Sequence, residues 1–165
     1  MPEHLFHRIA PHLLSLHRQT TLSWVTMLSQ NTQASQARQT FYIMLDGLYY
    51  IGSFDHTLPC NARGTQTGIL LIEAPDSNSC LSIITQARQV KRKEKRNQRV
   101  VEAIARKLKL MTQQLNQLAS IPLFELTPIQ GCFSKAGEQN YVLSSADLER
   151  ALYPALHRLQ TELAR

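Results

Sequence analysis

Cysteine is scarce in this sequence of 165 residues: its three cysteines, Cys60, Cys80 and Cys132, are far apart and form no Cys-x-x-Cys pair. Their odd number and wide spacing exclude the dense disulfide framework of small secreted domains. Long apolar runs are absent as well, since nowhere do about 18 apolar residues follow one another, as a membrane-spanning helix requires. The first residues lack the apolar segment and cleavage site of a signal peptide. These absences predict reduced thiols, a cytoplasmic location and no membrane partner.

Catalytic and metal-binding motifs are lacking too. The sequence has no Gly-x-Ser-x-Gly, and Gly64-x-x-x-Gly68 is not followed by the Lys-Ser/Thr of a phosphate-binding loop. Glu73 ends an expected strand, but the lysine that a metal-dependent nuclease places nearby is missing. The six histidines are not accompanied by cysteines at zinc-ligand spacing. We therefore predict no enzyme activity, no metal and no cofactor.

Glycine and proline are absent from two long stretches, residues 12–46 and residues 76–121. Stretches without these helix-breaking residues favour helices. In the first stretch, apolar residues recur every three or four positions, which predicts an amphipathic helix over about residues 11–29. In the second, apolar residues fall within one arc of about 100° when placed at 3.6 residues per turn. This pattern predicts one long basic helix over about residues 79–120.

A β-hairpin and a further strand are predicted within residues 41–73. Asp46-Gly47 favours a tight turn with positive φ angles, and the segments on either side are rich in aromatic and branched side chains. Residues 67–73 form the further strand and contain the apolar run Ile69 to Ile72, which is typical of a central strand with both faces covered.

The C-terminal part, residues 123–165, is predicted to contain short strands followed by a helix. The pattern Ser144-x-x-Asp147 resembles a capping box and would open that helix. Together the elements predict a single α+β domain over residues 1–165. Its small mixed sheet of about three to five strands, with at least one hairpin, would be flanked by an N-terminal helix, a long central basic helix and a C-terminal helix.

Positive charge is concentrated in one segment of the chain. Between Arg88 and Lys109, ten basic residues stand against two acidic ones, while the formal net charge of the whole chain is only +6. Concentrated positive charge attracts polyanions, and nucleic acid is the commonest of them. On a helical projection most of the arginines lie within about 60° of one another. The predicted phosphate contacts are Arg88, Lys91, Arg92, Lys95, Arg96, Arg99 and Arg106.

These observations predict a non-enzymatic nucleic-acid-binding protein, for DNA rather than RNA, that contacts the phosphate backbone through a basic helical face. Two other interpretations of the segment stay open: a solvated charged face, or a flexible basic loop over residues 91–99. The alternative function is a protein-interaction or chaperone-like homodimer, because a helix of about 60 Å is too long for one compact domain and would lie at a subunit interface. In this respect the order of elements resembles that of bacterial type III secretion chaperones, which are small dimers.

Overall fold

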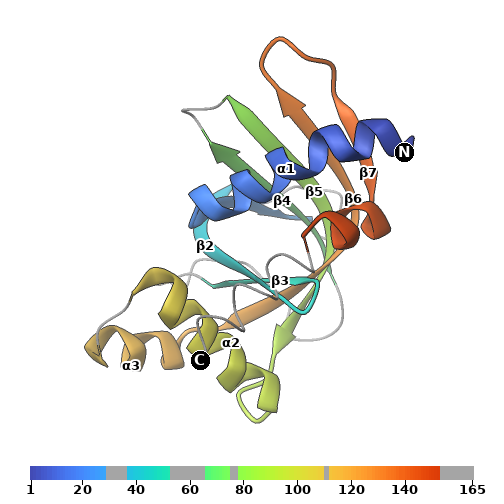
Figure 1. The fold of residues 1–165 in the computed structure, drawn as a ribbon. Coiled ribbons are helices and arrows are strands. Elements are labelled where there is room, and N and C mark those ends of the chain that lie inside the picture. The colour runs from blue at the N-terminus through green and yellow to red at the C-terminus, as the bar shows by residue number, and fades with distance from the viewer. Residues whose placement is uncertain (29–36, 53–65, 75–77, 110–111, 153–165) are drawn as a thin grey trace.

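The structure is a computed structural model that describes residues 1–28, 37–52, 66–74, 78–109 and 112–152 (Figure 1). Its strands are β1 (Leu22–Met27), β2 (Arg38–Leu45), β3 (Leu48–Gly52), β4 (Gln66–Ala74), β5 (Ser79–Val90), β6 (Leu123–Lys135) and β7 (Tyr141–Ser144). Its helices are α1 (Glu3–Gln19), α2 (Lys95–Leu108) and α3 (Thr112–Ser120), and residues 145–152 are also helical.

Six of the strands close into an antiparallel barrel. Their order is β3-β2-β1-β4-β5-β6, and pairing between β3 and β6 closes the ring, while β7 extends the sheet beyond β6. The predicted fold class is therefore wrong, because a closed barrel of six strands replaces a small mixed sheet flanked by a long helix. Closure depends on pairs such as Ile51 with Phe124, which are far apart in the sequence. Local patterns do not reveal such pairs.

Two local predictions are confirmed. β2 and β3 form the expected hairpin, and Asp46 and Gly47 have the positive φ angles, 53° and 78°, that a tight primed turn requires. The capping box is also present: the backbone N–H of Ser144 donates to Asp147 Oδ2 at 3.0 Å, and the backbone N–H of Asp147 donates to Ser144 Oγ at 3.1 Å. The helix it opens is described to residue 152, and the remainder of the predicted C-terminal helix lies outside the described residues.

The long basic helix predicted over residues 79–120 does not exist as one element. Its first third is β5, in which buried and more exposed side chains alternate along most of the strand. This alternation places Leu81 and Ile83 inside the barrel. Ile83 and Val90, seven positions apart, also fall on one side of a helix, which is why the helical pattern included them. α2 then begins at Lys95, and Lys109, with a left-handed φ of 52°, ends it.

The N-terminal helix predicted over residues 11–29 is wrong in its boundaries. α1 begins at Glu3, carries Pro11 inside it and ends at Gln19. The second half of the predicted helix is β1, where branched and aromatic residues alternate between exposed and buried positions. Trp24 therefore belongs to a strand and points outward, and it is not part of the amphipathic helix predicted over this range.

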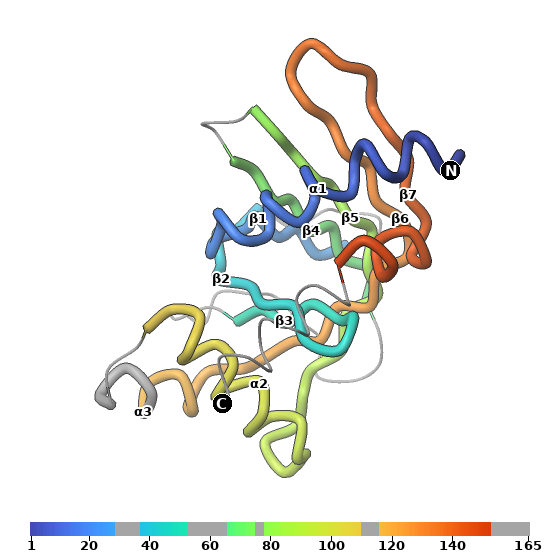
Figure 2. Tube along the Cα trace, viewed as in Figure 1, coloured from blue at the N-terminus to red at the C-terminus, as the bar shows by residue number. Residues whose placement is uncertain are grey.

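The helices cover two different parts of the sheet (Figure 2). α1 and residues 145–152 pack on the inward-facing side chains of the strands, such as Leu70, Ile72 and Leu81. α2 and α3 pack instead on outward-facing side chains of β2 and β3, against which Val100 and Ile104 of α2 are fully buried. Part of the outer surface of the barrel is thus covered by helices.

α1 is fastened to the barrel by a buried polar contact at His17. The ring Nδ1 lies 2.7 Å from the carbonyl oxygen of Leu13 and must donate to it, so Nε2 accepts the hydrogen bond from the Tyr49 hydroxyl at 2.6 Å. Burial lowers the pKa of His17 from 6.5 to about 4. The imidazole is therefore neutral at neutral pH and links α1 to β3.

This histidine should make the stability of the chain pH-dependent. Since the pKa of His17 is lower in the folded chain, only the unfolded chain takes up a proton between pH 6.5 and about 4. The free energy of unfolding should then fall by up to roughly 3 kcal/mol as the pH drops through this window. Urea unfolding of the wild type and of His17→Gln at pH 7 and pH 4.5 measures the difference. If the free energy of unfolding fell equally in both proteins between pH 7 and pH 4.5, His17 would not be the source of the pH dependence.

Candidate functional site

The outward side of β1, β4 and β5 forms a surface that we call the open face. Side chains alternate between the two sides of a strand, so every second residue of these strands points outward. The register places Trp24 opposite Leu71, and Ile69 opposite Ile84. The apolar members of the open face are Leu22, Trp24, Ile69, Leu71 and Ile84.

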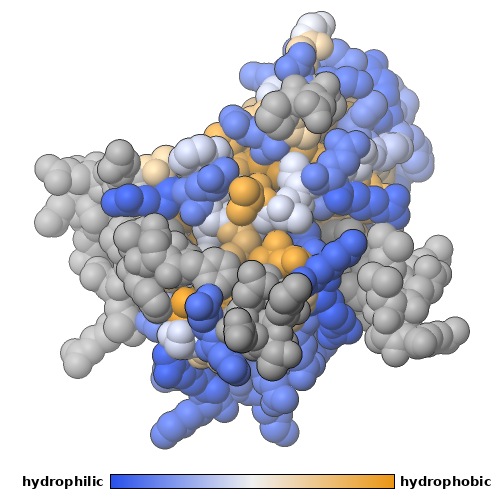
Figure 3. All heavy atoms as spheres, turned by 90° about the vertical axis from the view of Figure 1, so that its left-hand side faces the viewer, coloured by the Kyte–Doolittle hydropathy of each residue, from blue (hydrophilic) through white to orange (hydrophobic). Residues whose placement is uncertain are grey.

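These apolar side chains remain accessible to solvent. Leu22, Trp24 and Ile84 retain 49%, 41% and 42% exposure, although each is large and apolar. The surface view in Figure 3, from the left-hand side of Figure 1, shows that apolar atoms reach the surface among polar ones on that side of the molecule. Exposed apolar side chains on adjacent strands mark binding surfaces more often than single exposed ones do. The open face is therefore the candidate ligand-binding surface.

Charge is confined to the two ends of the open face. Among the outward residues of β1, β4 and β5, Glu73 lies at one end and Arg88 at the other. Arg88 is followed by the turn of residues 91–94, which contains Lys91, Arg92 and Lys93 and leads into α2. The apolar centre is thus bordered by a basic end and an acidic end.

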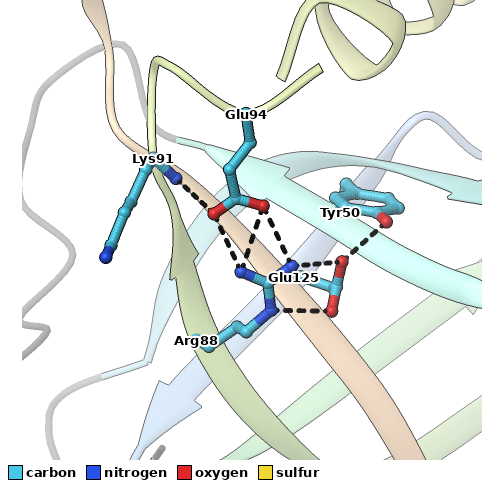
Figure 4. Close-up of polar contacts among 5 residues, drawn as sticks. All are labelled: Tyr50, Arg88, Lys91, Glu94 and Glu125. Carbon is cyan, nitrogen blue, oxygen red and sulfur yellow. Dashed lines mark hydrogen bonds and ion pairs between the residues drawn. The ribbon is translucent and has the colours of Figure 1, made fainter. Parts of the chain in front are cut away.

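Arg88 is the centre of an ion-pair cluster at the basic end (Figure 4). Its Nε donates to Glu125 Oε1 at 3.0 Å and its Nη2 donates to Oε2 at 3.2 Å, which joins β5 to β6 by a bidentate pair. Its Nη1 also donates to Glu94 Oε1 at 3.1 Å. Tyr50 of β3 donates its hydroxyl hydrogen to Glu125 Oε2 at 2.8 Å. Three strands and the turn before α2 therefore meet at one guanidinium.

This cluster neutralises the charge of Arg88 internally. The hydrogen bond from Arg88 holds the pKa of Glu94 below its ordinary value, and burial raises the pKa of Tyr50. Glu94 Oε1 also accepts the backbone N–H of Lys91 at 3.1 Å, which fixes the turn. Because two carboxylates already bind it, Arg88 is not the free phosphate contact that the sequence predicted.

The structure does not place the other predicted contacts on one helical face. Arg92 lies in the turn and donates to the carbonyl oxygen of Ser120 at 2.7 Å, while Lys95, Arg96, Arg99 and Arg106 lie on α2. Arg96 and Arg99 lie 2.5 and 3.4 Å from Asp46 Oδ2, and Arg106 donates to the carbonyl oxygen of Glu102. Within the described part of the chain, the side chains of Lys91 and Lys95 form no ion pair.

The outward positions of β5 and β6 also carry thiols. Cys80 and Cys132 are free and partly exposed, and burial is the main cause that raises the pKa of the Cys80 thiol. Among the described residues, no three histidine, cysteine or acidic side chains lie close enough to hold a metal ion. None of the described helices combines the length and apolar composition needed to cross a bilayer.

Comparison with known proteins finds similarity in structure alone. No family model matches the chain, and no curated protein is similar to it in sequence. Among solved structures, ChuZ from Campylobacter jejuni is 11% identical with a TM-score of 0.65, over 86% of this chain and 61% of ChuZ. The heme storage protein HutZ from Vibrio cholerae is 12% identical with a TM-score of 0.55, over 81% of this chain and 92% of HutZ. The chain therefore spans less than two thirds of the length of ChuZ.

A third solved structure has the same barrel fold. It is a protein from Clostridium acetobutylicum related to general stress protein 26, of the pyridoxinephosphate oxidase family. It is 8% identical with a TM-score of 0.57, over 86% of this chain and 97% of that one. The chain thus has the barrel fold of this class of proteins.

The predicted nucleic-acid-binding function is wrong. The basic helical face that carried it is divided among β5, a turn and α2, and Arg88, Arg96 and Arg99 are paired with acidic side chains. The fold is instead shared with a heme storage protein and with the pyridoxinephosphate oxidase class. The alternative, a dimeric module with a long helix at its interface, is wrong for the same reason, as is the resemblance to type III secretion chaperones.

Proposed function

We propose that this chain binds a planar, acidic cofactor of the heme or flavin class on its open face. The single observation that carries the proposal is an exposed apolar surface with one basic end, on a barrel that HutZ also has. A planar ring requires apolar contact, and its acid groups require cations. We propose binding and assign no reaction. A cytoplasmic location remains a proposal, supported by the free thiols of Cys80 and Cys132.

The side chains of the open face fit such a ligand. Trp24 offers an aromatic ring for stacking, and Leu71 and Ile84 offer apolar contact. Ile84 and Arg88 are four residues apart on the same side of β5, a distance of about 13 Å along the strand. Propionate or phosphate groups at that end would meet Lys91, whose side chain is exposed. A bound flavin or heme would supply electron-transfer chemistry.

An iron ligand is a stricter requirement for heme. Both ring nitrogens of His17 are already hydrogen-bonded inside the fold, and α1, which carries His4, His7 and His12, packs on the opposite side of the sheet. The thiols of Cys80 and Cys132 lie on outward positions near the open face, and thiolate is an established ligand of heme iron. Along the sheet, however, these thiols lie level with residues 80 and 82 of β5, about 20–26 Å from Arg88, so a heme held by one of them could not reach Arg88 with its propionates. Among the described residues, a flavin therefore fits the apolar centre and the basic end together, and a heme fits the apolar centre without an iron ligand beside Arg88.

A flat face buries only one side of a planar ligand, whereas binding sites bury most of the ligand surface. We propose that a second copy of the chain supplies the other wall. The acidic end at Glu73 and the basic end at Arg88 favour a two-fold axis that runs across the strands in the plane of contact, because this axis places each acidic end against the basic end of the partner. The two copies would therefore contact each other through their open faces, and not through a long helix as the sequence predicted.

Titration with hemin and with flavin mononucleotide tests the proposal. Trp24 is the only tryptophan of the chain, so its emission reports on the open face. One of the two ligands should quench this emission with a Kd of about 10 μM or tighter, in step with a change in the ligand's absorption spectrum. Analytical ultracentrifugation should show that the complex with the ligand contains two chains, with one or two ligands bound to each pair of chains. Binding of neither ligand, or binding without quenching, would contradict the proposal.

A further inference from the structure

We propose that Glu94 occupies the position of the ligand's acid group, so that the chain binds acidic cofactors only by displacing its own carboxylate from Arg88. This inference rests on the proposed function and adds a specific residue to it. Glu94 Oε1 and Oε2 accept hydrogen bonds from Nη1 and Nη2 of Arg88 at 3.1 and 3.3 Å. A carboxylate or phosphate can make the same contacts with a guanidinium.

The two carboxylates on Arg88 differ in how easily they can leave. Both carboxylates bind Arg88 through two oxygens. The side chain of Glu125 is only 10% exposed, stands on a barrel strand and also accepts the Tyr50 hydroxyl. The side chain of Glu94 is 31% exposed and belongs to a turn, not to a strand. Glu125 is therefore part of the barrel, while Glu94 is the exchangeable partner of Arg88 (Figure 4).

The surroundings of Glu94 hold more positive than negative charge. The turn around it carries Lys91, Arg92 and Lys93, and Lys95 follows at the first position of α2. Once Glu94 swings away, a ligand acid group would bind Arg88 within the positive electrostatic field of these residues. Because Arg88 lies at the end of the open face, a ligand could place its acid group beside Arg88 and its ring over the apolar centre.

The variant Glu94→Gln tests this inference. Glutamine keeps a side-chain oxygen for the backbone N–H of Lys91, so the turn should remain folded. Removing the competing charge should tighten the Kd for flavin mononucleotide or hemin by about threefold to tenfold, the range expected for one partly exposed ion pair. Riboflavin and hemin dimethyl ester, which have the same rings without the acid groups, should show no tightening.

Glu102→Gln is the matched control, because it removes one negative charge from an exposed position of α2 without touching Arg88. Equal tightening by Glu102→Gln, or equal tightening for the uncharged ligands, would overturn the inference and leave the proposed function standing. If no cofactor binds even to the wild type, the proposed function fails. The Kd of inorganic pyrophosphate, which has no ring, then tests the inference separately from the proposed function. Tighter binding to Glu94→Gln than to the wild type supports the inference, and equal binding overturns it.

Discussion

Replacing Arg88 with methionine should lower the free energy of unfolding by about 2–4 kcal/mol at neutral pH, because Glu125 would stay buried without its cation. Glu125 is only 8% exposed overall and would retain the Tyr50 hydroxyl as its sole polar side-chain partner in the cluster. Urea unfolding of the purified variant measures the loss. A charged residue on a freely solvated face would give a change within about 0.5 kcal/mol instead.

The double variant Arg88→Met, Glu125→Leu distinguishes an unpaired charge from lost packing. If the unpaired carboxylate causes the loss, removing it should restore most of the stability, since apolar replacements of a buried pair are often neutral. Arg99→Met is the matched control, because Arg99 is a more exposed arginine whose ion pair with Asp46 is 3.4 Å long. Equal losses in Arg88→Met and Arg99→Met would contradict the structural role of the cluster.

The parts of the fold that the sequence predicted are those determined by neighbouring residues. The Asp46-Gly47 turn and the reciprocal bonds of Ser144 and Asp147 each depend on a few consecutive positions. β5 was mistaken for a helix because its apolar residues satisfy both a period of 2 and a period of 3.6, and no glycine or proline interrupts it. Val90, the last residue of this strand, is buried.

The sequence did not predict the candidate site, because the residues that meet there are distant in the sequence. Charge counting identified Arg88 as a basic residue but could not show that Glu125, 37 positions later, lies opposite it in the β5–β6 register. The open face was equally hidden, since Trp24, Leu71 and Ile84 come from three strands. β1 gives no clear signal for it either, because Leu-Ser-Trp-Val-Thr-Met has apolar residues on both sides of the strand.

Substitution of Ile84 by glutamate should weaken cofactor binding by at least tenfold, because it places a carboxylate in the apolar centre of the open face. The same carboxylate would face its own copy across the proposed two-fold contact. Ile84 points outward and is 42% exposed, so the variant should fold with a free energy of unfolding within about 1 kcal/mol of the wild type. Val142→Glu, at an exposed position of β7 outside the open face, is the control.

The Kd of the bound cofactor, measured in parallel for the wild type, Ile84→Glu and Val142→Glu, shows whether the open face is the binding surface. Ile84→Glu should lose at least tenfold in affinity, while Val142→Glu should keep the wild-type value within about twofold. Wild-type affinity in a folded Ile84→Glu protein would contradict the proposal, because the open face could then not be the surface on which the cofactor binds.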